Sequence, residues 1–186
     1  MKPETNSLAS ERIAGPRHAV AFFDGPEEEY RVLLPFAKAC AECGDRCFHF
    51  LARERKAERA QKLAEAGVDL SASPGRTELR GWDESYLRGG RFVPGEMIDL
   101  VREIIDGTPR ARWWANMEWT AQQVVKEEAL VEYEFRLNPL IEQRNAIVVC
   151  VYQVGHHSAN VALGVLRAHP WIVVNGKLEP NPVYAS

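Results

Sequence analysis

The chain alternates short apolar runs, each of the length of a buried strand, with longer segments patterned as helices. The clearest runs are residues 18–23 and 146–152, which are almost continuously apolar instead of alternating with polar residues. Such runs are typical of strands that are covered on both faces, as in parallel sheets. The pattern therefore predicts a three-layer α/β fold, with a mainly parallel central sheet and helices on both of its faces.

The other predicted elements follow from apolar periodicity and from glycine and proline positions. Gly44 and Gly67 stand where helices are expected to end, and Pro35 is expected to kink or interrupt the first helix. Residues 16–186 are predicted to form a single domain, preceded by a flexible lead-in at residues 1–15. Strands are predicted at residues 46–52, 68–70, 77–79, 110–117 and 171–174, and helices at 26–43, 53–66, 94–106, 119–143 (as one or two) and 158–168.

The charge and hydropathy of the chain exclude several classes of partner. Lys and Arg number 23 against 26 Asp and Glu, so no excess of positive charge favours direct binding of nucleic acid. The longest apolar run is far shorter than the ~20 residues of a membrane helix, and the N-terminus has no apolar leader. We therefore expect a cytoplasmic protein that does not bind membranes, with its four cysteines as reduced thiols.

The segment after the first predicted strand stands where a phosphate-binding loop would lie. It reads Asp24-Gly25-Pro26, followed by three glutamates, and lacks the Gly-Lys-Ser/Thr that cradles phosphates. Pro26 removes one amide donor, and the glutamates would repel an anion. A functional nucleotide site is therefore not expected here.

Three cysteines and a histidine, Cys40, Cys43, Cys47 and His49, are of the types that bind zinc or iron–sulfur clusters. They fall across a predicted helix end and a predicted strand, so small apolar core residues are the favoured interpretation. A metal site or a redox role is the alternative. No cofactor is predicted, and His156 and His157 are interpreted as solvent-exposed.

Aromatic residues gather near the end of the predicted strand at 110–117. Trp113, Trp114 and Trp119 lie close together in sequence, and Tyr133 and Tyr152 follow. Aromatic side chains with polar groups line many small-molecule pockets, although they also serve as ordinary core residues. No nucleophile motif stands out, so binding of a small organic molecule is favoured over catalysis.

A series of short motifs follows in order along nearly the whole chain. They are His18, Gly44-Asp45, Ala66-Gly67-Val68-Asp69, Tyr86-Leu87-Arg88-Gly89-Gly90-Arg91-Phe92, Arg112 with Met117-Glu118-Trp119, Tyr133-Glu134-Phe135-Arg136-Leu137-Asn138, Cys150-Val151-Tyr152, His169-Pro170 and Asn181-Pro182-Val183-Tyr184. Together they resemble the MEDS domain, a family of sensory domains that looks like a degenerate relative of RecA/KaiC-type ATPases. Two departures are Gln153, where many relatives have an acidic residue, and the cysteine cluster, which is foreign to the family pattern.

The resemblance implies a RecA/KaiC-like fold and sensing of small hydrocarbon derivatives, with the signal passed to a protein partner such as a kinase or a transcription factor. Glu134 and Asn138, four residues apart, are expected to share one helix face. Self-association stays open. The alternatives are a metal-, thiol- or nucleotide-dependent enzyme and a pure protein-interaction module. The aromatic pattern and the resemblance together give the predicted ligand-binding residues: His18, Tyr86, Arg112, Trp114, Glu118, Trp119, Tyr133, Glu134, Tyr152 and His169.

Overall fold

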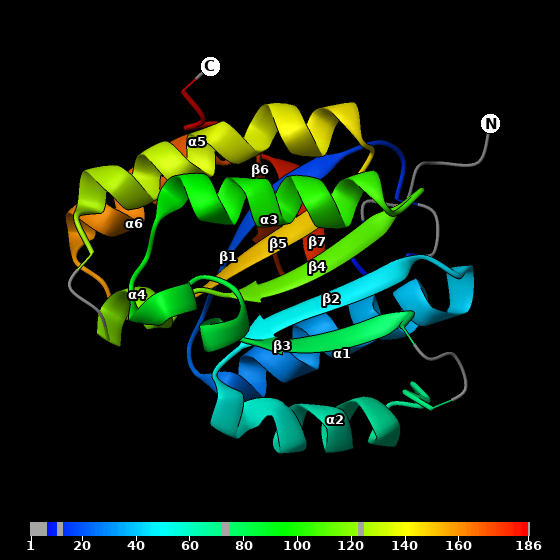
Figure 1. Ribbon diagram of the computed structural model, residues 1–186. Coiled ribbons are helices and arrows are strands. Elements are labelled where there is room, and N and C mark those ends of the chain that lie inside the picture. The colour runs from blue at the N-terminus through cyan, green and yellow to red at the C-terminus, as the bar shows by residue number, and fades with distance from the viewer. Residues whose placement is uncertain (1–6, 11–12, 72–74, 123–124, 186) are drawn as a thin grey trace.

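The computed structural model describes residues 7–10, 13–71, 75–122 and 125–185, and these residues form one seven-stranded sheet in the order β3-β2-β4-β5-β1-β6-β7 (Figure 1). All neighbouring strands are parallel except β7, which runs antiparallel to β6. This confirms the prediction of a mainly parallel α/β sheet. The strands are β1 (Arg17–Phe23), β2 (Arg46–Leu51), β3 (Thr77–Gly81), β4 (Ala111–Asn116), β5 (Ile147–Gln153), β6 (Trp171–Val174) and β7 (Lys177–Pro180).

Helices cover both faces of the sheet, as expected. Helices α3, α5 and α6 lie on one face, and α1 and α2 lie on the other (Figure 1). The bounds are α1 (Pro26–Cys43), α2 (Lys56–Glu65), α3 (Pro94–Asp106), α4 (Trp119–Gln122), α5 (Glu127–Gln143) and α6 (Ala159–Ala168), with short 3₁₀ turns at Arg53–Arg55, Trp82–Glu84 and Arg88–Gly90.

Most predicted elements are confirmed, and the exceptions have local causes. The strand predicted at residues 68–70 is wrong, because this segment is a turn that follows α2. The backbone N–H of Val68 donates to the Leu63 carbonyl, so it closes the helix end instead of pairing in the sheet. Pro35 lies within a continuous α1, which ends as predicted where Gly44 adopts a φ of 81°.

Alternate residues of the central strands enter two separate apolar cores. Val20, Cys150 and Tyr152 pack on the side of α3, α5 and α6, whereas Ala19 and Val149 pack on the side of α1 and α2. The register places Val20 beside Cys150 and Phe22 beside Tyr152 on the neighbouring strands β1 and β5. Because side chains alternate along a strand, His18 faces the same side as Cys150.

Both ends of the described chain pack onto the domain. Within the lead-in that was expected to be flexible, Leu8 and Ile13 are buried, and the Leu8 N–H donates to the Gly176 carbonyl. Near the C-terminus, the Asn181 amide donates to the carbonyls of Leu166 and His169. No helix among the described residues is both long and apolar enough to cross a membrane.

Candidate functional site

Glu134 is a fully buried carboxylate on the sheet-facing side of α5. Its Oε1 atom accepts a hydrogen bond of 2.7 Å from the Tyr152 hydroxyl. Its Oε2 atom lies 3.4 Å from Nε2 of His18 and 3.5 Å from Nε2 of His169. A carboxylate is rarely buried unless it is paired, and these contacts supply its partners. Glu134, His18 and His169 thus form a buried polar centre on the α5 face of the sheet.

Each histidine is held by its other ring nitrogen. Nδ1 of His18 lies 2.7 Å from Oδ1 of Asn138, and the Asn138 amide nitrogen donates to the Ala168 carbonyl at 2.9 Å. Because that donation identifies Oδ1 as an acceptor, Nδ1 of His18 carries the proton. Glu134 and Asn138 thus contact the two nitrogens of one imidazole, and the expectation that they share a helix face is confirmed.

His169 follows α6, and its Nδ1 atom donates to the Val165 carbonyl at 2.7 Å. Burial lowers the pKa of His169 to about 3, and the nearby His18 ring contributes in the same direction. The imidazole is therefore neutral at neutral pH, with an unprotonated Nε2. Among the described residues, this buried nitrogen has no hydrogen-bond partner.

Cys150 completes the cluster from the centre of β5. Its Sγ atom lies 3.5 Å from Nε2 of His18 and 3.8 Å from Oε2 of Glu134. Burial raises the pKa of the Cys150 thiol well above its usual value, and the Glu134 carboxylate raises it further. The sequence motifs included Cys150, but it was not among the predicted site residues.

An aromatic cluster adjoins this centre along α5. Tyr86 stacks on Trp119 with ring centroids 4.9 Å apart, and Phe92 packs against Trp119 at 4.6 Å and against Tyr133 at 5.4 Å. Tyr133 precedes Glu134 directly, so the aromatic cluster and the polar centre share one helix. Seven of the ten predicted ligand-binding residues lie in the two clusters: His18, Tyr86, Trp119, Tyr133, Glu134, Tyr152 and His169.

A cavity of about 270 Å³ opens onto the aromatic cluster at Phe92. Val125, which precedes α5, and Ala129, near the start of α5, line it together with Pro94 at the start of α3. Below Phe92, Trp119 is fully buried, and its indole N–H has no hydrogen-bond partner among the described residues. Among the described residues that line this cavity, Phe92 is the aromatic one, and it connects the cavity to the aromatic cluster.

Two predicted ligand-binding residues lie on the opposite face of the sheet. The indole N–H of Trp114 donates to the buried Glu29 at 2.7 Å, and the Arg59 guanidinium lies 3.5 Å from the centre of the Trp114 ring. Arg59 also donates to Glu29 at 2.8 Å. Trp114 therefore belongs to a buried ion-pair network under α1 and α2, remote from the polar centre.

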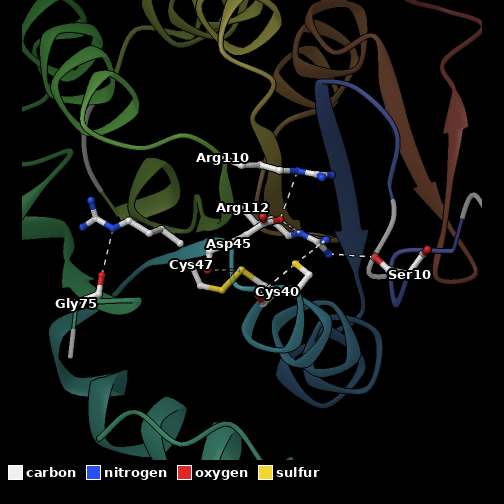
Figure 2. The surroundings of a disulfide bond; sticks show 9 residues. Ser10, Cys40, Asp45, Cys47, Gly75, Arg110 and Arg112 are labelled. Atoms are coloured by element: carbon white, nitrogen blue, oxygen red, sulfur yellow. Dashed lines mark hydrogen bonds and ion pairs between the residues drawn. A yellow bond between two sulfur atoms is a disulfide. The ribbon is translucent and has the colours of Figure 1, made fainter. Parts of the chain in front are cut away.

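Arg112 also lies on the α1 side, near the start of β4. It donates to Asp45 at 2.9 Å, to Cys43 Sγ at 3.2 Å and to the Ser10 carbonyl at 3.1 Å (Figure 2). These contacts join the helix end, the N-terminal segment and the sheet. Arg112 thus has a structural environment, and the structure does not bring it to the other predicted site residues.

Beside Arg112, Cys40 and Cys47 form a disulfide, which Figure 2 shows between α1 and β2. The expectation of four reduced thiols is therefore wrong for this pair. The weak metal candidate at Cys40, Cys43, Cys47 and His49 is also wrong, because the disulfide leaves Cys43 as its single free thiol. His49 is buried next to Arg59.

Glu118 lies at the carboxyl ends of the central strands, where it contacts His156 and His157. His156 Nδ1 contacts Oε2 of Glu118, and His157 Nε2 lies 3.4 Å from Oε1. His156 is half-exposed, but the side chain of His157 is 5% exposed, so the expectation of two solvent-exposed histidines is wrong for His157. Glu118 is thus at the end of the sheet, not in the polar centre.

At the position where a phosphate-binding loop would lie, the chain's own Glu28 carboxylate binds the backbone. The backbone N–H of Asp24 donates to the Glu28 carboxylate at 2.9 Å, and Pro26 begins α1 without an amide hydrogen. A carboxylate therefore occupies the helix N-terminus where a phosphate would bind. The start of α1 is therefore not free to bind a phosphate.

Comparison with known proteins places these observations in a family. The family model described as MEDS, the methanogen/methylotroph, DcmR sensory domain, matches residues 17–170. The chain belongs to the MEDS family. The resemblance found in the sequence is confirmed, and membership gives the domain a sensory role. No curated protein sequence matches this MEDS chain.

Solved structures confirm the fold. The crystal structure of the KaiC-like protein of the hyperthermophilic archaeon Pyrococcus horikoshii OT3 superposes with a TM-score of 0.62. The alignment covers 88% of this MEDS chain and 76% of that chain, at 11% sequence identity. At this identity the likeness establishes the RecA/KaiC-like fold alone.

Proposed function

We propose that this MEDS domain senses a small, weakly polar organic molecule that binds in the cavity beside Phe92. The observation that supports this most strongly is the aromatic cluster of Tyr86, Phe92, Trp119 and Tyr133 beneath that cavity. The cavity volume of about 270 Å³ is just below the range of about 300–1,000 Å³ that is typical of ligand pockets, which suits a molecule of few heavy atoms.

The chemistry of the cluster favours an apolar ligand with one hydrogen-bond acceptor. Aromatic faces bind an apolar body, and Phe92 contacts both the cavity and the Trp119 ring. The buried indole N–H of Trp119 has no hydrogen-bond partner among the described residues, so it could donate to an acceptor on the ligand. Small alcohols, halocarbons and amines fit this description.

Helix α5 is the element that we expect to carry the signal. It contributes Ala129 to the cavity, Tyr133 to the aromatic cluster and Glu134 to the polar centre. A ligand that shifts the start of α5 would therefore change packing along the helix. We propose that this change is passed, in the cytoplasm, to a partner such as a kinase or a transcription factor.

The test is a ligand panel of small alcohols, halocarbons, amines and nucleotides, followed by tryptophan fluorescence and thermal unfolding. A ligand at 100 times its Kd stabilises the folded state by about 2.7 kcal/mol, so binding raises the Tm. Ala129→Phe fills the Phe92 cavity and should abolish the response. Ala64→Phe is the matched control, because Ala64 lines a separate cavity beside α2.

The outcomes separate the proposal from its alternatives. A shift with an organic compound that Ala129→Phe removes and Ala64→Phe retains supports the proposal. No shift with any organic compound at millimolar concentration, or a shift unaffected by Ala129→Phe, contradicts it. A response to nucleotides alone would instead favour residual ATPase-like binding.

A further inference from the structure

The polar centre around Glu134 has the composition and the geometry of a metal site. His18 of β1, Glu134 of α5, Cys150 of β5 and His169 after α6 each offer one ligand atom, and all four atoms lie within 4.8 Å of one another. All four side chains are buried. These residues come from four separate elements, so the cluster depends on the complete fold of this face.

Four of the six distances between the ligand atoms are close to the edges of a coordination tetrahedron, and all six are within 4.8 Å. Zinc bonds of about 2.0–2.2 Å to nitrogen or oxygen and about 2.3 Å to sulfur require edges of about 3.4 Å, or about 3.6 Å with sulfur. The two histidine nitrogens lie 3.4 and 3.5 Å from Oε2 of Glu134. Sγ of Cys150 lies 3.5 Å from Nε2 of His18 and 3.8 Å from Oε2 of Glu134.

Both imidazoles are oriented as metal ligands. Nδ1 of His18 is held by the Asn138 oxygen and Nδ1 of His169 by the Val165 carbonyl, so each Nε2 directs its lone pair into the centre. Metal-bound histidines are almost always held in this way by an oxygen on the other nitrogen. The Tyr152 hydroxyl does the same for Glu134 by donating to Oε1, which leaves Oε2 facing the histidines.

In the absence of a cation, two hydrogen-bond acceptors of this cluster face each other. Nε2 of His169 and Oε2 of Glu134 are 3.5 Å apart in a buried site, and that nitrogen has no hydrogen-bond partner among the described residues. Repulsion between lone pairs is costly where water is excluded. A metal ion at the centre would satisfy both atoms.

The donor set identifies the class of ion. Two imidazoles, a thiolate and one carboxylate suit a borderline ion such as Zn²⁺, whereas Mg²⁺ and Ca²⁺ prefer oxygen ligands alone. We propose that His18, Glu134, Cys150 and His169 bind one zinc-class transition-metal ion. A cavity of about 240 Å³ near Trp171 is lined by His18 and Asn138, so it lies next to the proposed site. This site is independent of the organic ligand proposed above.

Cobalt absorption tests the site in the full chain. Protein stripped with a chelator is titrated with Co²⁺, and tetrahedral binding gives intense visible bands together with a near-ultraviolet band from thiolate-to-cobalt charge transfer. Cys43→Ser should retain both bands. Since Cys40 and Cys47 are joined in a disulfide, Cys150 is the remaining thiol in this variant, so its charge-transfer band reports Cys150.

Cys150→Ser should abolish the charge-transfer band. It should also weaken cobalt binding by a larger factor than the loss of an outer-shell partner, which is typically about 10–100-fold. One equivalent of Zn²⁺ should displace the Co²⁺ from the parent protein. The proposal is overturned if Cys43→Ser binds no Co²⁺ in tetrahedral form, or if its charge-transfer band is absent. Those two results need only Cys43→Ser, so the test stands even where Cys150→Ser fails to fold. Neither of these two results for Cys43→Ser affects the test of the organic ligand in the Phe92 cavity.

Discussion

Nε2 of His18 lies 3.4 Å from Oε2 of Glu134, and both side chains are buried against the same face of the sheet. β1 supplies the imidazole and α5 supplies the carboxylate, so this contact forms only once the helix has docked on the sheet. Asn138, one turn further along α5, holds the opposite nitrogen of the same ring. The contact therefore links the packing of α5 to the orientation of a candidate ligand.

Asn138 is expected to act as a positioning residue for the metal site. Asn138→Ala removes the acceptor for Nδ1 of His18, so the ring loses its fixed orientation and cobalt affinity should fall about 10–100-fold. Asn138→Asp keeps an acceptor oxygen and should recover much of that affinity. Competition titrations with a metal indicator provide the measurement. Equal cobalt affinities in Asn138→Ala and the parent protein would argue against this role.

The two buried tryptophans of β4 should differ in their contribution to stability. Trp114→Phe leaves Oε1 of Glu29 without its indole donor, and a buried polar group that loses a partner costs about 1–3 kcal/mol. Trp113→Phe is the matched control, because its buried indole N–H has no partner among the described residues. Urea unfolding should show the larger loss for Trp114→Phe. Indistinguishable losses would contradict the importance of the Glu29 contact.

Gly164 permits the close approach of α6 to α5. A Cβ atom at this position would lie 2.6 Å from Cγ2 of Val131, so Gly164→Ala should destabilise the protein by about 1–3 kcal/mol despite the higher helix propensity of alanine. Gly95→Ala, in the first turn of α3, meets no atom within 4 Å and should be neutral or stabilising. Adding Val131→Ala to Gly164→Ala should restore part of the loss. If the double variant is no more stable than Gly164→Ala, the clash is not the cause.

Glu118 should contribute stability that depends on pH. Burial would raise the pKa of Glu118, but hydrogen bonds from His157, His156 and the Gln153 N–H outweigh it and lower the pKa below its ordinary value. A carboxyl group with a lowered folded-state pKa stabilises the protein above its unfolded pKa of about 4.3, and this stabilisation is lost as the pH falls further. Glu118→Gln should therefore lose about 1 kcal/mol at pH 7, and the difference should shrink below about pH 4. Urea midpoints at several pH values check this; a constant difference would refute the assignment.

The sequence predicted the sheet well because its signals are local. Continuous apolar runs mark β1 and β5, and Gly44 marks the end of α1. The run at residues 68–70 resembles a short strand in composition, but it lies next to α2 and closes that helix by a turn. Strand β7 was not predicted, because its pairing with β6 is a tertiary contact.

The candidate site was predicted in part. Motif resemblance named His18, Tyr133, Glu134 and His169, which the structure brings together or places side by side. Cys150 was missed as a site residue, although its spacing from Tyr152 puts both on one face of a strand. Which strand lies beside β5 cannot be inferred from periodicity, so the proximity of Cys150 to His18 required the sheet order.

The central claim, that a small organic molecule binds over the aromatic cluster, is tested most directly by diffraction from crystals soaked with a brominated small alcohol or alkane that raises the Tm in solution. Bromine scatters anomalously, so its position can be read without model bias. We predict a bromine peak in the cavity lined by Phe92, Val125 and Ala129. A peak instead in the separate cavity of about 500 Å³ beside Pro35, or no peak at the stabilising concentration, would contradict the account.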